Sequence, residues 1–158
     1  MTETSRAVQR SPVAPVDCNL ARAFEVIGDK WSLMILRSVL YGVVRFDDIQ
    51  ADIGVTKSVL SSRLKRLCDA GFLQKEGYKI KGERARIEYV ASPMTHALTI
   101  PFIALTQWAD HWLDEREGKP VRFRERRDNS DLRVALVNDD KRVVDLRDVF
   151  PEFSQTSR

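Results

Sequence analysis

The chain of 158 residues is long enough for one domain with an appendage and too short for two full-sized domains. Apolar residues make up 43% and charged residues 31%, which allows a hydrophobic core with a solvated surface and argues against global disorder. Its two cysteines, Cys18 and Cys68, are too few for a disulfide scaffold or a cysteine-rich zinc site. The N-terminal segment has no apolar core of a secretory signal, so we expect a cytoplasmic protein without membrane contact.

The net charge of +3 is unevenly distributed along the chain. Between residues 56 and 86, nine Lys or Arg residues stand against three Asp or Glu residues. This local excess is typical of a surface that binds a polyanion, and a solvated basic face without a ligand is the alternative.

Residues 1–17 are expected to form a flexible arm. No proline occurs over residues 16–92, so regular structure can run uninterrupted there. Apolar residues at steps of three and four predict helices over 19–27, 31–41 and 46–53, each followed by a glycine that can end it. In the first of these helices the apolar positions include Leu20 and Phe24.

A longer helix is predicted over residues 56–70, with Thr56 as its N-cap and Gly71 after its end. Leu60, Leu64 and Leu67 recur at steps of four and three, so they are expected to form the buried stripe. The opposite face of this helix would then carry hydroxyl and basic side chains.

The pattern then changes to strands over 72–78 and 87–90, joined by a basic, glycine-containing turn. These two strands complete a predicted domain over 18–92. Ser92 and Pro93 begin a helical segment over 93–117, which Pro101 should kink or divide into two helices in tandem. The remaining segment, 118–158, is predicted to contain a β-hairpin.

Helices, a glycine-containing turn, a longer helix and a basic hairpin follow one another in the order of a winged helix-turn-helix. The predicted fold class is mainly α with a small β wing, an α+β architecture. The helix over 56–70 would enter the major groove of DNA, and the hairpin would contact the backbone or a minor groove. The predicted DNA-contacting residues are Thr56, Lys57, Ser58, Ser61, Ser62, Arg63, Lys65, Arg66, Lys79, Lys81, Arg84 and Arg86.

A family pattern runs in unbroken order from residue 18 to residue 113. It comprises Cys18, residues 23–31 ending in Gly-x-Lys-Trp, residues 35–37, 45–49, 60–67, 70–73 and 86–89, and finally Pro101 and Trp108. On these segments the chain resembles the HxlR-type regulators, a branch of the MarR-like winged-helix repressors. The wing departs from the family, which often has a proline-rich turn where this chain has Gly82-Glu83-Arg84-Ala85, and the core family lacks the tail after Gly118. The resemblance implies a homodimeric, nucleoid-associated transcription regulator on an inverted-repeat operator, and we expect a repressor.

An apolar stripe within residues 93–117 indicates a homodimer independently of that resemblance. The stripe is too apolar to remain in water, so a second copy would cover it, and packing on its own domain is the alternative. Two-fold symmetry then places two recognition helices about one duplex turn, ~34 Å, apart. The predicted interface residues are Leu98, Phe102, Leu105, Trp108, Ala109 and Trp112.

Two routes could carry a signal. In relatives that sense electrophiles, quinones or oxidants, a cysteine at the position of Cys18 is the reactive one, so Cys18 is a candidate redox sensor, with a structural role as the alternative. Because Cys18 stands at the start of a helix, the helix N-terminus would favour the thiolate form of its side chain. Cys68 is expected to be a small core residue. The second route is a small aromatic or electrophilic effector held between the winged domain and the helix of Trp108 and Trp112.

Other function classes lack the residues they need. His96 and His111 have no partner at metal-ligand spacing, so neither a metal nor a cofactor is expected. No glycine-rich phosphate loop or recognisable catalytic triad occurs, so we expect no enzyme. The rival function is a winged-helix protein-interaction module that does not bind DNA, and its binding would not fall steeply with salt as DNA binding does.

Overall fold

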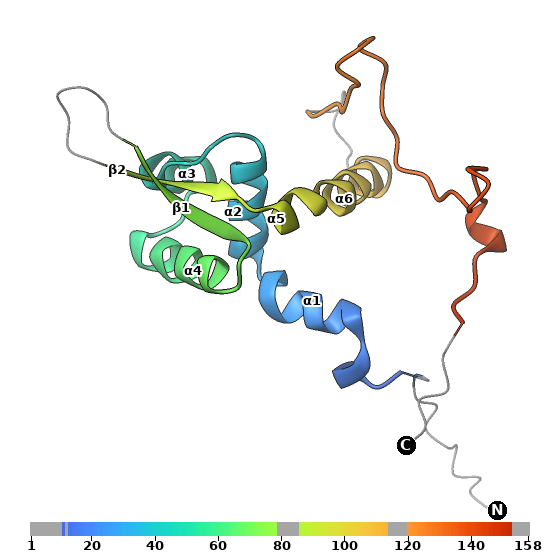
Figure 1. Ribbon diagram of the computed structural model, residues 1–158, viewed down its shortest axis with the longest axis horizontal. Coiled ribbons are helices and arrows are strands. Elements are labelled where there is room, and N and C mark those ends of the chain that lie inside the picture. Colours follow the sequence, from blue (N-terminus) through green and yellow to red (C-terminus); the bar gives the residue numbers. More distant parts are fainter. Residues whose placement is uncertain (1–10, 12, 79–85, 114–119, 153–158) are drawn as a thin grey trace, which may run out of the picture.

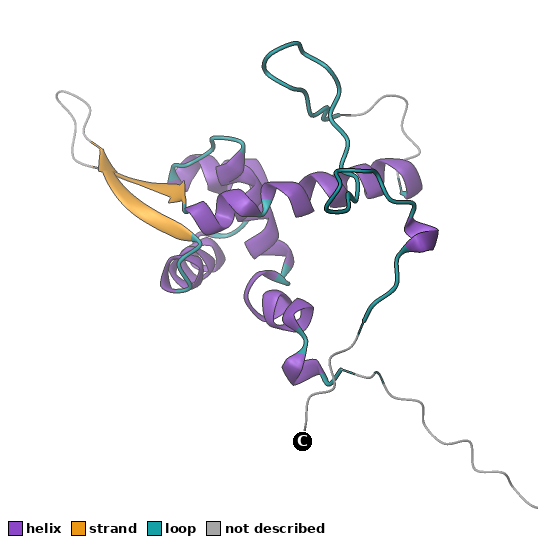
Figure 2. Ribbon diagram, turned by 45° about the vertical axis from the view of Figure 1, so that its right-hand side comes forward, coloured by secondary structure: helices purple, strands orange, loops and turns teal. Residues whose placement is uncertain are grey.

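The computed structural model describes residue 11 and residues 13–78, 86–113 and 120–152. The winged part lies at one end of the molecule, and α1 and α6 extend away from it (Figures 1 and 2). No helix in the described part of the chain is long and apolar enough to cross a membrane. The elements in chain order are η1 (Pro15–Asp17), α1 (Asn19–Ile27), α2 (Lys30–Leu40), α3 (Phe46–Ile53), α4 (Lys57–Asp69), β1 (Leu73–Tyr78), β2 (Arg86–Ala91), α5 (Pro93–Ala97), α6 (Thr99–Trp112) and η2 (Leu146–Asp148).

The core of the molecule is built around α2. Its Ile35 and Leu36 are fully buried, together with Ile49 from α3 and with Leu60 and Leu64 from α4. Burial of each such side chain contributes about 1.5–3 kcal/mol, so these contacts hold the three helices as one unit. The four helices predicted before the hairpin are confirmed, and so is the leucine stripe of α4.

The turn between α3 and α4 sets the direction of α4. Gly54 has a φ of 66°, in the left-handed region that a glycine adopts without steric cost. Val55 then turns into the core, and the Val59 N–H donates to the hydroxyl of Thr56 at 3.5 Å, which makes Thr56 the N-cap as predicted.

The wing is a two-stranded antiparallel sheet, with Tyr78 of β1 opposite Arg86 of β2 at its outer end. At the inner end the Tyr89 N–H donates to the carbonyl of Val44, just before α3, at 2.8 Å. The wing is therefore attached to the helix-turn-helix by backbone hydrogen bonding. Its tip, residues 79–85, lies outside the described residues.

Two helices in tandem follow the wing, as predicted, but the break comes at Leu98 and not at Pro101. A helix running through this segment would need an N–H at Pro101 and would bring its ring against the Ala97 carbonyl one turn earlier. Starting α6 after Leu98 places Pro101 in the first turn, where its missing N–H costs nothing. Ser92 caps α5 by accepting the Thr95 N–H at 3.3 Å.

The tail turns where a β-hairpin was predicted, but the structure does not show the two strands of that hairpin. No strand occurs in the described residues 120–152, where two isolated antiparallel bridges join Arg124 to Asp131 and Val137 to Val143. An isolated two-stranded hairpin is marginal in water unless it packs on another element, and most of the tail residues are exposed. The tail runs as an extended chain on the side of the molecule away from the wing (Figure 1).

A side-chain amide holds the middle of the tail on α6. The Nε2 of Gln107 donates to the Leu132 carbonyl at 2.9 Å, and its Oε1 accepts the Val134 N–H at 3.0 Å. The amide thus supplies the two backbone partners that a neighbouring strand would offer. Sequence periodicity does not reveal this contact, because it joins residues 25 and 27 positions apart.

One carboxylate joins the start of α2 to α4. Asp29 is the N-cap of α2: its Oδ1 accepts the N–H groups of Trp31 and Ser32, each at 3.1 Å, and its Oδ2 accepts the Ser32 hydroxyl at 2.6 Å. The Nε of Arg63 on α4 also donates to Oδ1, at 3.0 Å. Partial burial raises the pKa of Asp29, but the Ser32 hydrogen bonds and the Arg63 charge outweigh it and hold that pKa below its usual value.

Asp29→Ala should lower the free energy of unfolding by about 2 kcal/mol near neutral pH, through loss of the cap and of the Arg63 bond. Because the folded pKa of Asp29 is depressed, its charge stabilises the protein above the unfolded pKa of about 3.9, and that contribution is lost as the pH falls through the folded pKa. In urea denaturation, the difference in free energy of unfolding between parent and variant should therefore be smaller near about pH 3 than near about pH 7. Asp29→Asn, which keeps a capping side chain, is the matched control. An identical difference in free energy of unfolding at both pH values would contradict the stabilising role of the Asp29 charge.

Candidate nucleic-acid interface

The outer face of α4 carries small hydroxyls and basic side chains. Leu60, Leu64 and Leu67 fix the helix to the core, so the opposite face is held in one orientation. Short hydroxyl side chains let a helix approach base edges closely. The predicted contact residues that the structure places in the open on or next to α4 are Thr56, Lys57, Ser58, Ser61, Ser62, Lys65 and Arg66.

Two arginines of α4 also tie this helix to its neighbours. Arg63 is half-buried and bonded through Nε to Asp29, and Arg66 donates to the backbone carbonyl of Glu25 in α1. Both were predicted as DNA contacts on helical spacing alone. The structure adds that each one positions α4 against the helices before it.

The two lysines of α4 differ in their surroundings. Lys65 donates to Asp69, one turn along the helix, at 2.5 Å, and this hydrogen bond raises the pKa of Lys65. Both side chains are largely exposed, so the pair contributes little and Lys65 can exchange Asp69 for a phosphate. Within the described part of the chain, Lys57 has no ion-pair partner. Lys57, at the first position of α4, is therefore the cation most directly available to a polyanion.

The wing contributes Arg86 among the described residues, and the predicted contacts Lys79, Lys81 and Arg84 lie outside them. Sequence reasoning did not assign a role to Arg45, which braces the wing. Its Nε donates to Glu88 of β2 at 3.2 Å, and its guanidinium lies 4.7 Å from the centre of the Tyr78 ring. The hydrogen bond to Glu88 raises the pKa of Arg45.

Arg45 belongs to the family pattern at residues 45–49. Its contact with Glu88 could not be predicted from local sequence, because the two residues are 43 positions apart. The brace joins both strands of the wing to the start of α3. It therefore helps to set the angle between the wing and the helix-turn-helix.

A second surface lies on α6. Leu105, Trp108 and Trp112 recur at steps of three and four and are 55%, 54% and 68% exposed; we call them the α6 stripe. Two other members of the predicted interface, Leu98 and Phe102, pack against the protomer's own core. Ala109, the remaining member, is half-buried.

An apolar face of α1 adds to the exposed surface at this end of the molecule. Leu20 and Phe24, which belong to the apolar pattern of that helix, are 66% and 54% exposed, and only Ile27 of α1 is buried. The helical spacing predicts that these residues share a face, but it does not show that the face lies outside the protomer's core.

Both cysteines are free thiols and half-buried. Cys18 is the N-cap residue of α1, and its side chain makes no capping hydrogen bond. Cys68 packs against the core as predicted, and burial raises the pKa of its thiol, with Lys75 acting in the opposite direction. In the described residues no three His, Cys, Asp or Glu side chains gather as a metal site would require.

A recognition helix fixed behind a glycine turn, with a braced two-stranded wing beside it, defines a DNA-binding winged helix-turn-helix protein. The chain belongs to the HxlR-like helix-turn-helix family, whose sequence model matches residues 26–117. This is a family of transcriptional regulators and not of enzymes.

The similarity to known proteins extends beyond the winged part of the chain. The HTH-type transcriptional regulator Rv3095 of Mycobacterium tuberculosis is 31% identical over 136 residues, which cover 85% of this chain and 84% of that protein. The crystal structure of PA1607, described as that of a transcription factor, matches this fold with a TM-score of 0.75 at 26% identity. The match covers 87% of this chain and 95% of that one. Both matches are longer than the 117 residues that precede the tail, so they run into it.

The redox regulator HypR in its oxidised form shares the fold. It has a TM-score of 0.55 at 21% identity, and the match covers 61% of this chain and 99% of that one.

The buried placement of Cys68 predicts low reactivity. In a Cys18→Ser variant, where Cys68 is the only thiol left, an aromatic disulfide reagent should react about tenfold more slowly with the folded protein than with the urea-unfolded protein near pH 7. The rate of the folded protein should keep rising above about pH 9, because the thiolate is the nucleophile and burial raises its pKa. Stopped-flow absorbance measures both rates, and equal rates for the two states would show that Cys68 is open to solvent.

Proposed function

We propose that the protein is a repressor that binds an inverted-repeat operator as a homodimer, with α4 in the major groove and the wing alongside. The exposed hydroxyl face of α4, with Lys57 at its start, is the observation that carries this proposal. Hydroxyls near base edges supply discrimination between sequences, and cations around them supply affinity for phosphates.

The homodimer is supported by the apolar surface on α1 and α6. The α6 stripe, together with Leu20 and Phe24, would expose several large side chains to water in a monomer. A second copy related by a two-fold axis would bury the same patch on both subunits. The two recognition helices would then address half-sites about one turn, ~34 Å, apart.

We further propose that a chemical signal releases the operator, and Cys18 is one receiver for it. Cys18 begins α1, whose exposed Leu20 and Phe24 belong to the surface assigned to the dimer. A modification of its thiol would alter the packing of α1 and, with it, the spacing of the recognition helices. The fold shared with HypR, a redox regulator, is in keeping with this route.

Substitutions on α4 should separate affinity from specificity. Lys57→Ala should weaken binding to operator and random duplex by similar factors and lower the slope of log K against log salt by about one unit. Ser61→Ala or Ser62→Ala should cost about tenfold on an operator selected from random duplexes and little on random DNA. Fluorescence anisotropy over a salt series measures both effects, with Arg126→Ala in the tail as a charge-matched control.

If all of these variants lose affinity for operator and for random DNA by the same factor, the assignment of the base-reading face is wrong. If the parent protein does not bind duplex DNA even at low salt, a protein-interaction module takes its place.

A charge in the α6 stripe should separate the subunits. Trp112→Glu should give monomers in sedimentation velocity and reduce operator affinity by at least about 100-fold, because one half-site offers too little contact. Ile87→Glu, which places the same charge at an exposed apolar position on β2, should leave the dimer intact. A Trp112→Glu protein that sediments as a dimer would place the interface elsewhere.

Oxidation should identify the role of Cys18. A mild oxidant or a quinone should release the operator from the parent and from Cys68→Ser, but not from Cys18→Ser, because only Cys18 adjoins the surface assigned to the dimer. Electrophoretic mobility shift with and without reductant measures the release. Equal release from Cys18→Ser would remove Cys18 as the sensor.

A further inference from the structure

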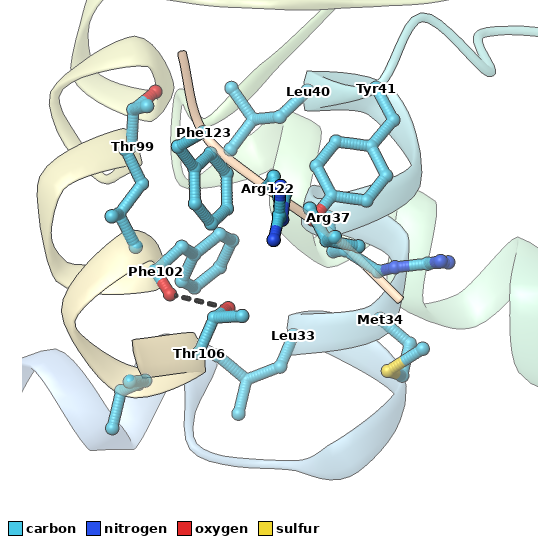
Figure 3. A pocket seen from close by; sticks show the side chains of 13 residues that line it. Leu33, Met34, Arg37, Leu40, Tyr41, Thr99, Phe102, Thr106, Arg122 and Phe123 are labelled. Atoms are coloured by element: carbon cyan, nitrogen blue, oxygen red, sulfur yellow. Dashed lines mark hydrogen bonds between the residues drawn. The ribbon is translucent and has the colours of Figure 1, made fainter. Parts of the chain in front are cut away.

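A hollow lies between α2 and α6, and the start of the tail crosses it (Figure 3). Its volume of about 690 Å³ falls within the range of small-molecule sites, ~300–1,000 Å³. Leu33 and Leu40 of α2 and Phe102 and Ile103 of α6 form apolar walls. Neither Trp108 nor Trp112 lines it, but the hollow lies between the winged domain and the helix that carries them, where a small effector is expected from the sequence.

The tail completes the hollow. Val121, Arg122 and Phe123 line it, although the family match ends at residue 117. Phe102 and Phe123 both line the hollow, and in the close view the Arg122 side chain is drawn between Phe123 and Tyr41 (Figure 3). Aromatic walls of this kind favour a flat apolar ligand.

The charges around the hollow are not equivalent. Arg37 is already committed: its Nη1 donates to Asp52 at 3.0 Å, and its guanidinium lies 4.9 Å from the centre of the Tyr41 ring. Arg122 has no ion-pair partner among the described residues. None of the described residues that line the hollow is acidic, so among them Arg122 is one cation without an opposite charge in an otherwise mostly apolar space.

We propose that this hollow binds an aromatic monocarboxylate, with the ring against Phe102 and Phe123 and the carboxylate on the guanidinium of Arg122. Guanidinium groups bind carboxylates through two parallel hydrogen bonds, which fix the orientation of the ligand as well as adding affinity. An uncharged ligand of the same shape would bury the same apolar area but leave Arg122 unpaired.

Such a ligand would act on DNA binding through α2, and this step rests on the proposed function. α2 packs against α4 and is joined to it by the Asp29–Arg63 bond, whereas α6 carries the stripe assigned to the dimer. A molecule wedged between α2 and α6 changes the angle between the DNA-binding part and the dimer surface. In a two-fold dimer that angle sets the spacing of the two α4 helices, so ligand and operator compete through it.

Calorimetry on the full chain without DNA tests the site. 2-Naphthoate, an aromatic carboxylate of about 13 heavy atoms, should bind with a Kd of roughly 0.1 mM, and uncharged 2-naphthamide about tenfold more weakly. Arg122→Gln should bring the naphthoate affinity down to that of the amide and leave the amide unchanged. Phe123→Ala should weaken both probes, and Arg126→Gln, also in the tail, should weaken neither.

Several results would overturn the site. Equal naphthoate affinity in the parent and in Arg122→Gln would remove Arg122 as the carboxylate partner. Binding to Trp112→Glu monomers but not to the parent would show that a second subunit fills the hollow.

Operator binding is measured separately, so the failure of one proposal is distinguishable from the failure of the other. The unliganded parent tests the proposed function alone. Naphthoate should weaken operator binding by the parent about tenfold, a typical allosteric coupling, but have little effect on Arg122→Gln. Binding of naphthoate with no change in operator affinity would overturn the link to DNA while the site itself stood.

Discussion

The carboxylate of Asp29 is the contact on which the orientation of the DNA-binding helix depends. It takes up the unpaired N–H groups at the start of α2 and holds Arg63 of α4 at the same time. The buried leucines decide which face of α4 points inward, but apolar contacts are not directional and do not fix the exact position of the helix. A charged hydrogen bond at a fixed point on each helix removes that freedom.

α2 contacts both α4 and the hollow beside α6. Along its length it meets α4, which carries the face that we propose reads bases, and it also forms one wall of the hollow shared with α6. Its core residues Ile35 and Leu36 are fully buried, so α2 is packed tightly against the elements around it. In the mechanism we propose, a ligand in the hollow would therefore act on the DNA-binding part by changing a helix angle.

Much of the candidate site could be predicted from the chain because it depends on local spacing. The N-cap at Thr56 and the inward leucines place Ser61 and Ser62 on the outer face by helical geometry alone. The brace from Arg45 to Glu88 and the bond from Arg63 to Asp29 could not be predicted, since each joins positions more than 30 residues apart. The hollow is also invisible to periodicity, because three separate segments supply its walls.

The sequence by itself determined the order of the helices and the wing, and the helix starts at Thr56 and Ser92, because apolar period, glycine and proline act within one or two turns. It also indicated the family, through residues spread from Cys18 to Trp108. Only the tertiary structure decided which apolar residues face outward: Phe102 packs inward, whereas Leu20 and Phe24 remain exposed. It likewise decided that the described part of the tail contains a bridged turn without strands and lies against α6 through Gln107. Both outcomes depend on which surfaces are already occupied by other elements, and that is a property of the whole packed chain and not of any local pattern.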